Sequence, residues 1–250
     1  MDREKQIIFG IHPILEKLKV SPAEVEEIII ADGPLRSAAR SVDTAARRVG
    51  VRVNYVSPAA LDRLVAGQRH QGVAAKITAV PYLQVSRLLE SVPSSSGPEQ
   101  ILILDGLTDP HNFGALLRTA EAVGIEHVII PKDRSVGVTS AVVKASAGAV
   151  HHLNIYKATN LRRTINSLKD QGFWFVGLDV QATDGIYDRV LPDRIGIVLG
   201  SEGEGIRPLI RHECDFLVSI PMAGKIASLN VAVAGAVFLY ELVRQKRAKM

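Results

Sequence analysis

The chain has 250 residues, 47% of them hydrophobic, which is enough for one large domain or two ordinary domains with real apolar cores. Thirty Lys and Arg residues against 26 Asp and Glu residues give a net charge of +4, a mild preference for an anionic partner. The single cysteine, Cys214, excludes an internal disulfide and a cysteine-based metal cluster, and it suits a reducing cytoplasm.

Residues 7–80 have the pattern of a small α/β unit. We expect helices near 12–19, 35–49 and 57–65, and strands near 26–31, 51–56 and 72–80. Arginines recur through this unit, and they form either a solvated face or a set of phosphate contacts on RNA. They are Arg36, Arg40, Arg47, Arg48, Arg52, Arg63 and Arg69.

The segment Pro93–Pro98, PSSSGP, is the clearest linker in the chain because it has no apolar residue and is framed by prolines. An amphipathic stretch at 83–92 before it predicts a short helix. We therefore place the domain boundary within 81–99.

From residue 100, short apolar runs alternate with helical segments. Continuously apolar strands that alternate with helices predict an α/β fold with a parallel sheet covered on both faces. The expected strands are 101–104, 127–130, 151–155, 174–178, 195–200 and 216–220, and the expected helices are 113–124, 138–147, 160–171, 206–212 and 228–246. Ligands of such sheets bind beyond the carboxyl ends of the strands, so the loops after Leu104, Leu199 and Ile220 are the candidate sites.

Metal ligands are not expected in these loops. None of the seven histidines falls in a metal-binding spacing, and His151 and His152, as neighbours on an expected strand, point to opposite faces. We therefore predict no metal.

The first loop, 105–114, is longer than a connection needs, and it leads into the helix that carries Arg118. Asn112 is either a helix cap or a functional residue, and Arg118 is either a surface cation or a functional residue. The second loop, Gly200–Gly205, has the sequence GSEGEG, whose glycines let the backbone approach a ligand closely. Glu202 and Glu204 would repel a pyrophosphate, so the loop is either a ligand site for a neutral or cationic group or a tight turn with solvated acids.

The third stretch, 220–242, predicts a helix that starts near Ser228 and is apolar on every face. Such a helix is buried or lies in a membrane. Ser228, Asn230 and Glu241 interrupt the apolar run, and the N-terminus MDREKQ is charged, so we expect a buried helix without a membrane span or signal peptide. A cap at the helix start accounts for Ser228, but it leaves Asn230 unexplained.

The segments DPHNFGALLRTA, GSEGEGI and IPMAGKIASLNVAVAGAVFLYEL together resemble, in order, the three motifs of the SpoU (TrmH-like) family of RNA 2′-O-ribose methyltransferases. FGIHPILEKL and HQGVAA resemble the small substrate-binding domain of bacterial members. The resemblance covers essentially the whole chain.

The resemblance implies a domain organisation and a partner state. Residues 1–80 would be an L30e-like RNA substrate-binding domain, 81–99 a linker, and 100–250 a SPOUT-type domain with a deep trefoil knot. The protein would be a cytoplasmic homodimer with its sites at the interface.

The resemblance also implies the site. Gly200, Ile220 and Leu229 would contact S-adenosylmethionine through their backbones. The active-site polar residues would be Asn112, Arg118, Glu202, Ser228 and Asn230.

The roles of these side chains follow from their chemistry. An arginine is a poor general base because it stays charged, so Arg118 would orient the 2′-hydroxyl and its 3′ phosphate. Asn112 and Asn230 would hold loop and ribose, and Glu202 would orient neighbouring Asn or Arg side chains. Ser228 would cap the helix and shape the pocket.

The substrate implied is the ribose of a guanosine in 23S rRNA. Transfer RNA is the alternative within the family, and an RNA-binding module without catalysis is the alternative outside enzymes. A nucleotide-dependent oxidoreductase is a third alternative, which lacks its glycine fingerprint here.

Overall fold

The computed structural model describes residues 5–20, 22–33, 37–78, 81–92 and 99–248. The chain divides into two compact units. Unit 1 comprises residues 1–80 and 137–152, and unit 2 comprises residues 81–136 and 153–250. The predicted linker Pro93–Pro98 lies outside the described residues.

Unit 1 is built on a four-stranded mixed sheet in the order β1-β4-β2-β3. The sheet is antiparallel except for the β2–β3 pair. Its elements are β1 (Lys5–Phe9), α1 (Ile11–Val20), the 3-10 turn η1 (Pro22–Glu24), β2 (Val25–Ala31), α2 (Ser37–Arg48), β3 (Arg52–Val56), α3 (Pro58–Leu64) and β4 (Val73–Thr78). Strand β1 was not predicted from the sequence, and Ser57 caps α3 by accepting a hydrogen bond from the backbone N–H of Ala60.

The segment 137–152 belongs to unit 1 although its neighbours in the chain are strands of unit 2. It contains α6 (Ser140–Ala145) and the 3-10 turn η3 (Ala149–His152). Lys144 donates a hydrogen bond to the carbonyl of Arg69, and its ammonium lies over the ring of Phe9. A side chain at Gly148 would meet Glu16 of α1 at 2.8 Å, so the segment and α1 are in close contact.

The contact between the segment 137–152 and α1 also includes a buried ammonium group. Lys17 of α1 is fully buried, pairs with Glu24, and lies 3.2 Å from Nδ1 of His151. The strand expected at 151–155 is therefore wrong at its start: His151 and His152 lie in η3, and β8 begins at Asn154. Their side chains contact α1 instead of the two faces of a sheet, since His152 lies 3.0 Å from Glu16.

We expect His151 to make unit 1 sensitive to acid. Burial, and next the charge of Lys17, lower the pKa of His151 from 6.5 to about 3. The unfolded chain takes up a proton near pH 6.5 and the folded chain does not, so stability is lost as the pH falls from about 6.5 towards 3. At pH 5 the loss from this residue amounts to about 2 kcal/mol.

The opening free energy of α1, measured by native-state hydrogen exchange at pH 7.5 and pH 5, checks this. The variant His151→Gln removes the titrating group and should show a smaller loss between the two pH values. His152→Gln, a change at the exposed neighbour, serves as the control and should behave as the native chain does. An equal acid loss in His151→Gln would contradict the assignment.

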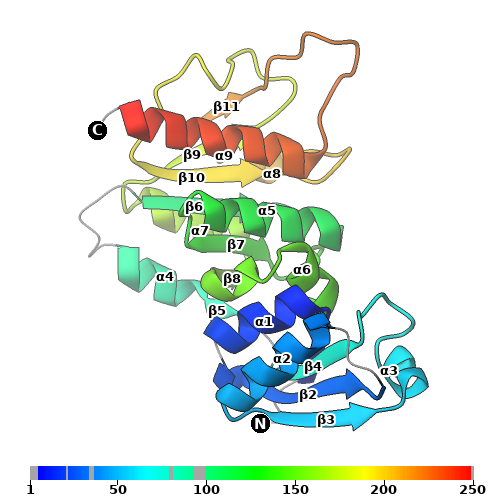
Figure 1. Ribbon diagram of the computed structural model, residues 1–250. Coiled ribbons are helices and arrows are strands. Elements are labelled where there is room, and N and C mark those ends of the chain that lie inside the picture. Colours follow the sequence, from blue (N-terminus) through cyan, green and yellow to red (C-terminus); the bar gives the residue numbers. More distant parts are fainter. Residues whose placement is uncertain (1–4, 21, 34–36, 79–80, 93–98, 249–250) are drawn as a thin grey trace. The chain divides into compact units, whose positions relative to one another are not determined.

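Unit 2 is built on a seven-stranded sheet in the order β11-β9-β10-β6-β7-β8-β5 (Figure 1). Every pair in it is parallel. Its strands are β5 (Leu83–Gln84), β6 (Glu99–Leu104), β7 (His127–Pro131), β8 (Asn154–Ala158), β9 (Trp174–Leu178), β10 (Arg194–Leu199) and β11 (Phe216–Val218). The predicted parallel α/β fold is confirmed, with β5 as an additional edge strand drawn from the segment expected to be a linker.

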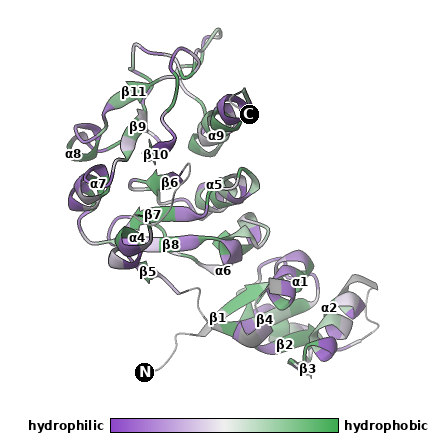
Figure 2. Ribbon diagram, turned by 90° about the vertical axis from the view of Figure 1, so that its left-hand side faces the viewer, coloured by the Kyte–Doolittle hydropathy of each residue, from purple (hydrophilic) through white to green (hydrophobic). Residues whose placement is uncertain are grey.

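Helices cover both faces of this sheet (Figure 2). They are α4 (Val85–Ser91), α5 (Pro110–Ala122), α7 (Leu161–Lys169), α8 (Pro208–Arg211) and α9 (Val231–Ala248). Helices α5 and α9 lie together on one face, and α4, α7 and α8 lie on the other. Gly235 allows α9 its close approach, because a side chain there would meet Leu116 of α5 at 2.4 Å and Leu199 of β10 at 2.8 Å. None of the described helices is both long and apolar enough to cross a membrane.

Two expectations for α9 are wrong. The helix begins at Val231 and not near Ser228, since residues 221–230 are exposed and non-helical. It is also not buried on every face, because Val233 is 50% exposed and Tyr240 is 56% exposed. Its buried side, with Phe238 and Leu242, faces the sheet and α5.

Candidate active site

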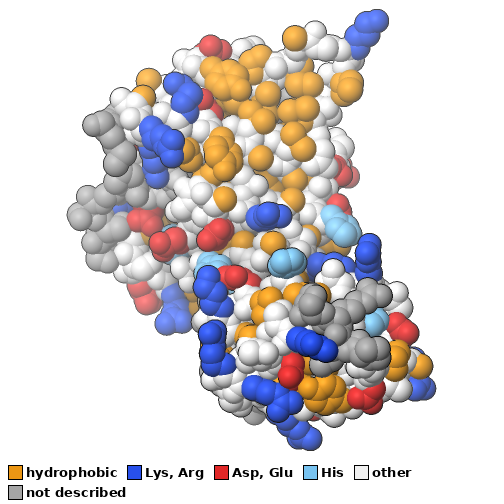
Figure 3. Space-filling view, in the orientation of Figure 1, with side chains coloured by type: hydrophobic (Ala, Val, Ile, Leu, Met, Phe, Trp, Pro, Cys, Tyr) orange, Lys and Arg blue, Asp and Glu red, His pale blue; other side chains and the backbone are white. Residues whose placement is uncertain are grey.

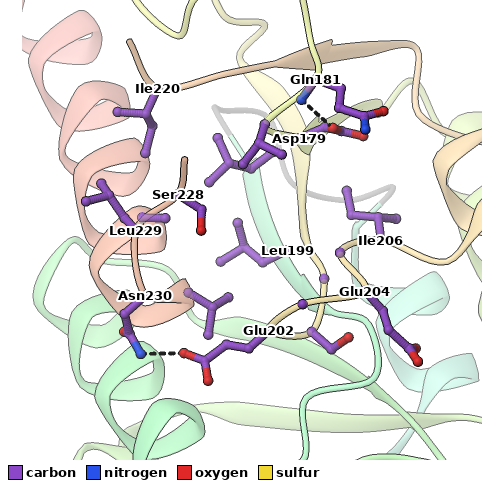
Figure 4. A pocket seen from close by; sticks show the side chains of 18 of the residues that line it. Asp179, Gln181, Leu199, Glu202, Glu204, Ile206, Ile220, Ser228, Leu229 and Asn230 are labelled. Carbon is purple, nitrogen blue, oxygen red and sulfur yellow. Dashed lines mark hydrogen bonds between the residues drawn. The ribbon is translucent and has the colours of Figure 1, made fainter. Parts of the chain in front are cut away.

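A pocket of about 590 Å³ lies in unit 2, lined by residues that follow the carboxyl ends of β9, β10 and β11 (Figure 4). This is the edge at which the parallel-sheet pattern predicts a ligand. Its apolar lining includes Leu178, Leu199, Ile206, Ile220 and Leu229, and its polar lining includes Asp179, Gln181, Glu202, Glu204, Arg211, Ser228 and Asn230. Two of the three predicted loops, those after Leu199 and Ile220, thus line one pocket.

The loop after β10 is folded tightly upon itself. Ser201 and Gly205 exchange backbone hydrogen bonds of 3.1 and 3.0 Å, which closes residues 201–205 into a small turn. A side chain at Gly200 would lie 2.0 Å from the carbonyl carbon of Gly205, so only glycine fits there. The glycines of this loop were expected to let its backbone approach a ligand closely. In the structure, Gly200 lies close to the backbone of the loop itself.

Asp105 anchors the end of this loop to the sheet. Its carboxylate is fully buried at the end of β6 and accepts hydrogen bonds from the backbone N–H of Arg207 at 3.0 Å and from its Nε at 2.8 Å. A buried carboxylate paired with a guanidinium in this way is costly to break, so the pair fixes the loop that forms one wall of the pocket. Asp105 was not among the predicted site residues, although it is the first polar residue after an apolar strand.

Asn230 joins the three predicted loops. Its side-chain N–H group donates to Oδ1 of Asn112 at 2.9 Å and to Oε1 of Glu202 at 2.5 Å. Its own Oδ1 accepts from the backbone N–H groups of Ala232 and Val233 at 3.0 and 3.3 Å, which caps α9. Figure 4 shows Glu202 reaching across one end of the pocket to Asn230. The side-chain amide of Asn230 thus uses both its donor and its acceptor, which holds it in one orientation.

The expected cap by Ser228 is wrong, and of the two alternatives for Asn112 the helix cap is excluded. Asn230 caps α9, and Ser228 lies three residues before the helix, where its side chain lines the pocket. Asp109 caps α5 by accepting from the N–H groups of His111 and Asn112 at 3.0 and 3.4 Å. Asn112 is therefore inside the first turn, 8% exposed, and its side chain is free to bind Asn230.

The predicted cofactor residues Gly200, Ile220 and Leu229 all line the pocket, as do Glu202, Ser228 and Asn230. Arg118 does not. It lies on an exposed face of α5, and within the described residues it forms no ion pair or hydrogen bond. The structure thus brings together every predicted site residue except Arg118.

Another wall of the pocket is formed by residues that were not predicted as site residues from the sequence. Asp179, which follows β9, accepts from Nε of Arg211 at 2.6 Å and from the backbone N–H of Gln181 at 2.8 Å. Its side chain is 15% exposed. Asp179 could have been predicted from its position after an apolar strand, which is the feature that identified the loops after Leu104 and Leu199.

The lining fits a ligand that is partly apolar and carries a positive centre. The lining includes three carboxylates, of Asp179, Glu202 and Glu204, and one guanidinium, of Arg211, so its formal charge is negative. The volume lies within the usual range for small-molecule sites. In the part of the chain that the structure describes, no three His, Cys, Asp or Glu side chains gather into a metal site.

Two protein families match the chain. Residues 99–240 match the SpoU rRNA methylase family, and residues 7–83 match the family of RNA 2′-O ribose methyltransferase substrate-binding domains.

Named relatives match over nearly their full length. The 23S rRNA (guanosine-2′-O-)-methyltransferase RlmB of Xylella fastidiosa is 40% identical over 98% of this chain and 99% of its own. The putative TrmH family tRNA/rRNA methyltransferase YacO of Bacillus subtilis is 37% identical over 98% of both chains.

Solved structures share the fold. A crystal structure of an RNA 2′-O ribose methyltransferase superimposes with a TM-score of 0.78 at 27% identity, covering 98% of this chain and 90% of the other. The SpoU methyltransferase AviRb of Streptomyces viridochromogenes, in complex with AdoMet, superimposes with a TM-score of 0.80 at 24% identity, covering 98% and 91%.

Proposed function

The chain belongs to the SpoU rRNA methylase family of S-adenosylmethionine-dependent enzymes, and on that premise we propose that it methylates the ribose 2′-hydroxyl of a guanosine in 23S rRNA. The observation that carries the proposal is the network of Asn112, Asn230 and Glu202 at one end of a negatively charged pocket. The full-length relative from Xylella fastidiosa, named for this substrate, supports the choice of RNA. Transfer RNA is the second candidate, since the relative from Bacillus subtilis is named for both RNAs.

The residues present fit the cofactor. When bound, S-adenosylmethionine supplies a methyl group on a cationic sulfonium with a good leaving group. The backbones of Gly200, Ile220 and Leu229 would hold it, and the carboxylates of the lining suit its positive charge. Apolar side chains such as Leu199 and Ile206 exclude water from the same space.

The polar network would position the substrate. Asn230 and Glu202 fix each other at the end of the pocket, and Asn112 fixes both to the first turn of α5. This rigidity suits the placement of a ribose hydroxyl against a methyl group, since an error of about 1 Å in such a placement costs roughly a hundredfold in rate. Ser228 would shape the pocket beside it, and the substrate phosphate or water would accept the hydroxyl proton.

We also propose the domain roles, the partner state and the location that the resemblance implies. Residues 1–80 would bind RNA, 81–99 would connect, and 100–250 would form the catalytic domain with a trefoil knot. The matches to residues 7–83 and 99–240 support this division. The family relationship to rRNA-modifying enzymes supports a cytoplasmic location.

Mapping 2′-O-methyl groups on 23S rRNA and on transfer RNA, before and after incubation with the protein and S-adenosylmethionine, tests the function. A new methyl group on one guanosine of 23S rRNA is expected. Methylation of transfer RNA alone would shift the proposal to the second candidate. Binding of S-adenosylmethionine without methylation of either RNA would contradict it.

The exposed apolar face of α9 supports a homodimer. Val233 and Tyr240 lie seven residues apart, hence on one face of the helix, and both are at least half exposed. Figure 3 shows hydrophobic side chains gathered where Figure 1 draws α9. Contiguous exposed apolar patches are typical of protein interfaces.

Val233→Glu is expected to convert the dimer into a monomer, because the charge would be buried without a partner in the interface. Sedimentation velocity at micromolar concentration measures the mass directly. Val49→Glu is the control, since Val49 is exposed to 38% in unit 1, and it should leave the mass unchanged. A dimer in Val233→Glu would show that this face of α9 is not the interface.

Arg118 is expected to serve the pocket of the partner subunit. The family resemblance gives it an active-site role, yet it does not line the pocket of its own chain. Arg118→Ala and Asn230→Ser should each be inactive as homodimers. Mixed and refolded together, they should recover about a quarter of wild-type methylation, because half of the dimers would carry one intact site of two. No recovery would place Arg118 in the site of its own chain, and an active Arg118→Ala homodimer would remove its role.

A further inference from the structure

Helix α2 has two different faces. Ala39, Val42 and Ala46 are buried, and they pack the helix on α1 and the sheet of unit 1. Arg40, Thr44 and Arg48 are exposed and follow one another at intervals of four residues, which places them in one row. The row runs for roughly 12 Å along the helix axis.

A shallow hollow follows this row. It measures about 410 Å³ and is lined by Arg40, Ser41, Thr44, Ala45 and Arg48. The three side chains between the arginines are short, so an extended partner can approach the helix closely there. Figure 3 shows further Lys and Arg side chains in unit 1, over the region where Figure 1 draws α2 and β3.

The two arginines of the row are uncompensated. Among the described residues, neither Arg40 nor Arg48 forms an ion pair. Their neighbour Arg47 differs, since its guanidinium lies 3.0 Å from the carboxylate of Asp43 and 3.3 Å from the hydroxyl of Tyr55. Asp43, the acidic residue of α2, is therefore already paired with Arg47.

Helix stability does not account for both arginines. A cation in the last turn of a helix is favoured by the helix dipole, which suits Arg48. Arg40 lies in the first turn, where the same dipole disfavours a cation. A role towards something outside the chain accounts for both residues.

We propose that the row Arg40–Thr44–Arg48 on α2 binds the phosphate backbone of the RNA substrate. The proposal rests on the proposed function, which supplies the polyanion. Guanidinium groups donate paired hydrogen bonds to phosphate oxygens, and the hydroxyl of Thr44 lies between them as a further donor. Their separation exceeds the spacing of neighbouring phosphates along a strand, so the row contacts at least two.

The side chains that line the hollow also indicate which features of an RNA it does not recognise. Its lining holds no aromatic ring for base stacking and no amide side chain for a base edge. Contacts made there position the RNA without selecting its sequence. Selection of the methylated nucleotide is then left to other surfaces, including the pocket of unit 2.

The test compares RNA binding by the full chain and by the variant Arg40→Gln/Arg48→Gln. Binding to a 23S rRNA transcript and to a transfer RNA transcript is measured from 50 to 300 mM salt, without cofactor. Loss of two phosphate contacts should reduce the slope of log affinity against log salt by about 1.4. Affinity at 100 mM salt should fall roughly tenfold on both RNAs.

Arg47→Gln/Arg52→Gln is the matched control. It removes the same charge from the same unit, but at arginines that face Asp43 and Glu27. Its salt slope should stay near that of the native chain. Binding of S-adenosylmethionine, measured by calorimetry, should be the same for all three proteins and shows that unit 2 remains folded.

The outcomes separate the two proposals. An unchanged salt slope in Arg40→Gln/Arg48→Gln, or an equal loss in the control, would overturn the role of α2. The role of α2 would also be overturned if an acidic polypeptide bound to this row and RNA did not. A selective loss of RNA affinity in a protein that methylates neither RNA would leave the α2 proposal standing and contradict the proposed function.

Discussion

Asn230→Asp is expected to abolish methylation while leaving α9 capped. The oxygen that accepts from Ala232 and Val233 is retained in aspartate, so the helix keeps its cap. The N–H donor that binds Asn112 and Glu202 becomes a second, charged oxygen. Three oxygens then face one another, and the like charges of residues 202 and 230 repel each other at close range.

The structural consequence of this change is local. The buried amide oxygen of Asn112 loses its donor, which costs roughly 1–3 kcal/mol, and Glu202 turns away from the pocket. Because the network positions the ribose, we expect the single-turnover rate to fall by at least a hundredfold.

Single-turnover methylation and thermal unfolding measure the two effects separately. Asn230→Ala is the companion variant, since it removes the cap as well as the bridge, and it should lose about 1 kcal/mol of stability beyond the loss in Asn230→Asp. Asn230→Asp should lose activity with a smaller loss of stability. A single-turnover rate within threefold of the native rate would show that the bridge to Asn112 and Glu202 is not needed.

Gly200→Ala is expected to remove cofactor binding. The added methyl group would lie 2.0 to 2.2 Å from backbone atoms of Gly205 and Ile206, which no side-chain rotation can relieve. The turn closed by Ser201 and Gly205 must open, and the wall of the pocket moves with it. We expect the dissociation constant of S-adenosylmethionine to rise more than a hundredfold, as measured by calorimetry.

Gly224→Ala is the matched control. Gly224 lies in the neighbouring loop, has no atom within 4 Å of an added methyl group, and does not require the left-handed backbone conformation. The same chemical change should alter cofactor affinity less than twofold there. Native-like affinity in Gly200→Ala would show that the turn at 200–205 is not a fixed wall of the pocket.

The parallel sheet of unit 2 was predictable because strands that are buried on both faces are apolar at every position, and such runs are visible in the sequence. Runs such as ILIL at 101–104 and IGIVL at 195–199 are apolar throughout, and they are β6 and β10. The same runs located the loops at their carboxyl ends. They could not show β5, whose two residues pair with β8 and are too short to carry a pattern.

The start of α9 shows why the rest was not predictable. Ser228 and Asn230 are both good cap residues, and local sequence does not rank them. In the structure Asn230 is the cap, and its side chain is held in place by Asn112, which lies 118 residues away. Interactions over such separations leave no periodic pattern. The contact of His151 with Lys17, across 134 residues, escaped prediction for the same reason.

The division of the chain at 80, 136 and 152 has a consequence for how this protein can be recombined with its relatives. A chimera made by a single crossover near residue 80 would transplant α1 and β1 but leave behind α6 and η3, which pack on them. The buried ammonium of Lys17 would then meet a foreign residue in place of His151. Transfer of unit 1 between homologues therefore requires two sequence stretches to be moved together, 1–80 and 137–152, although they are not contiguous in the gene.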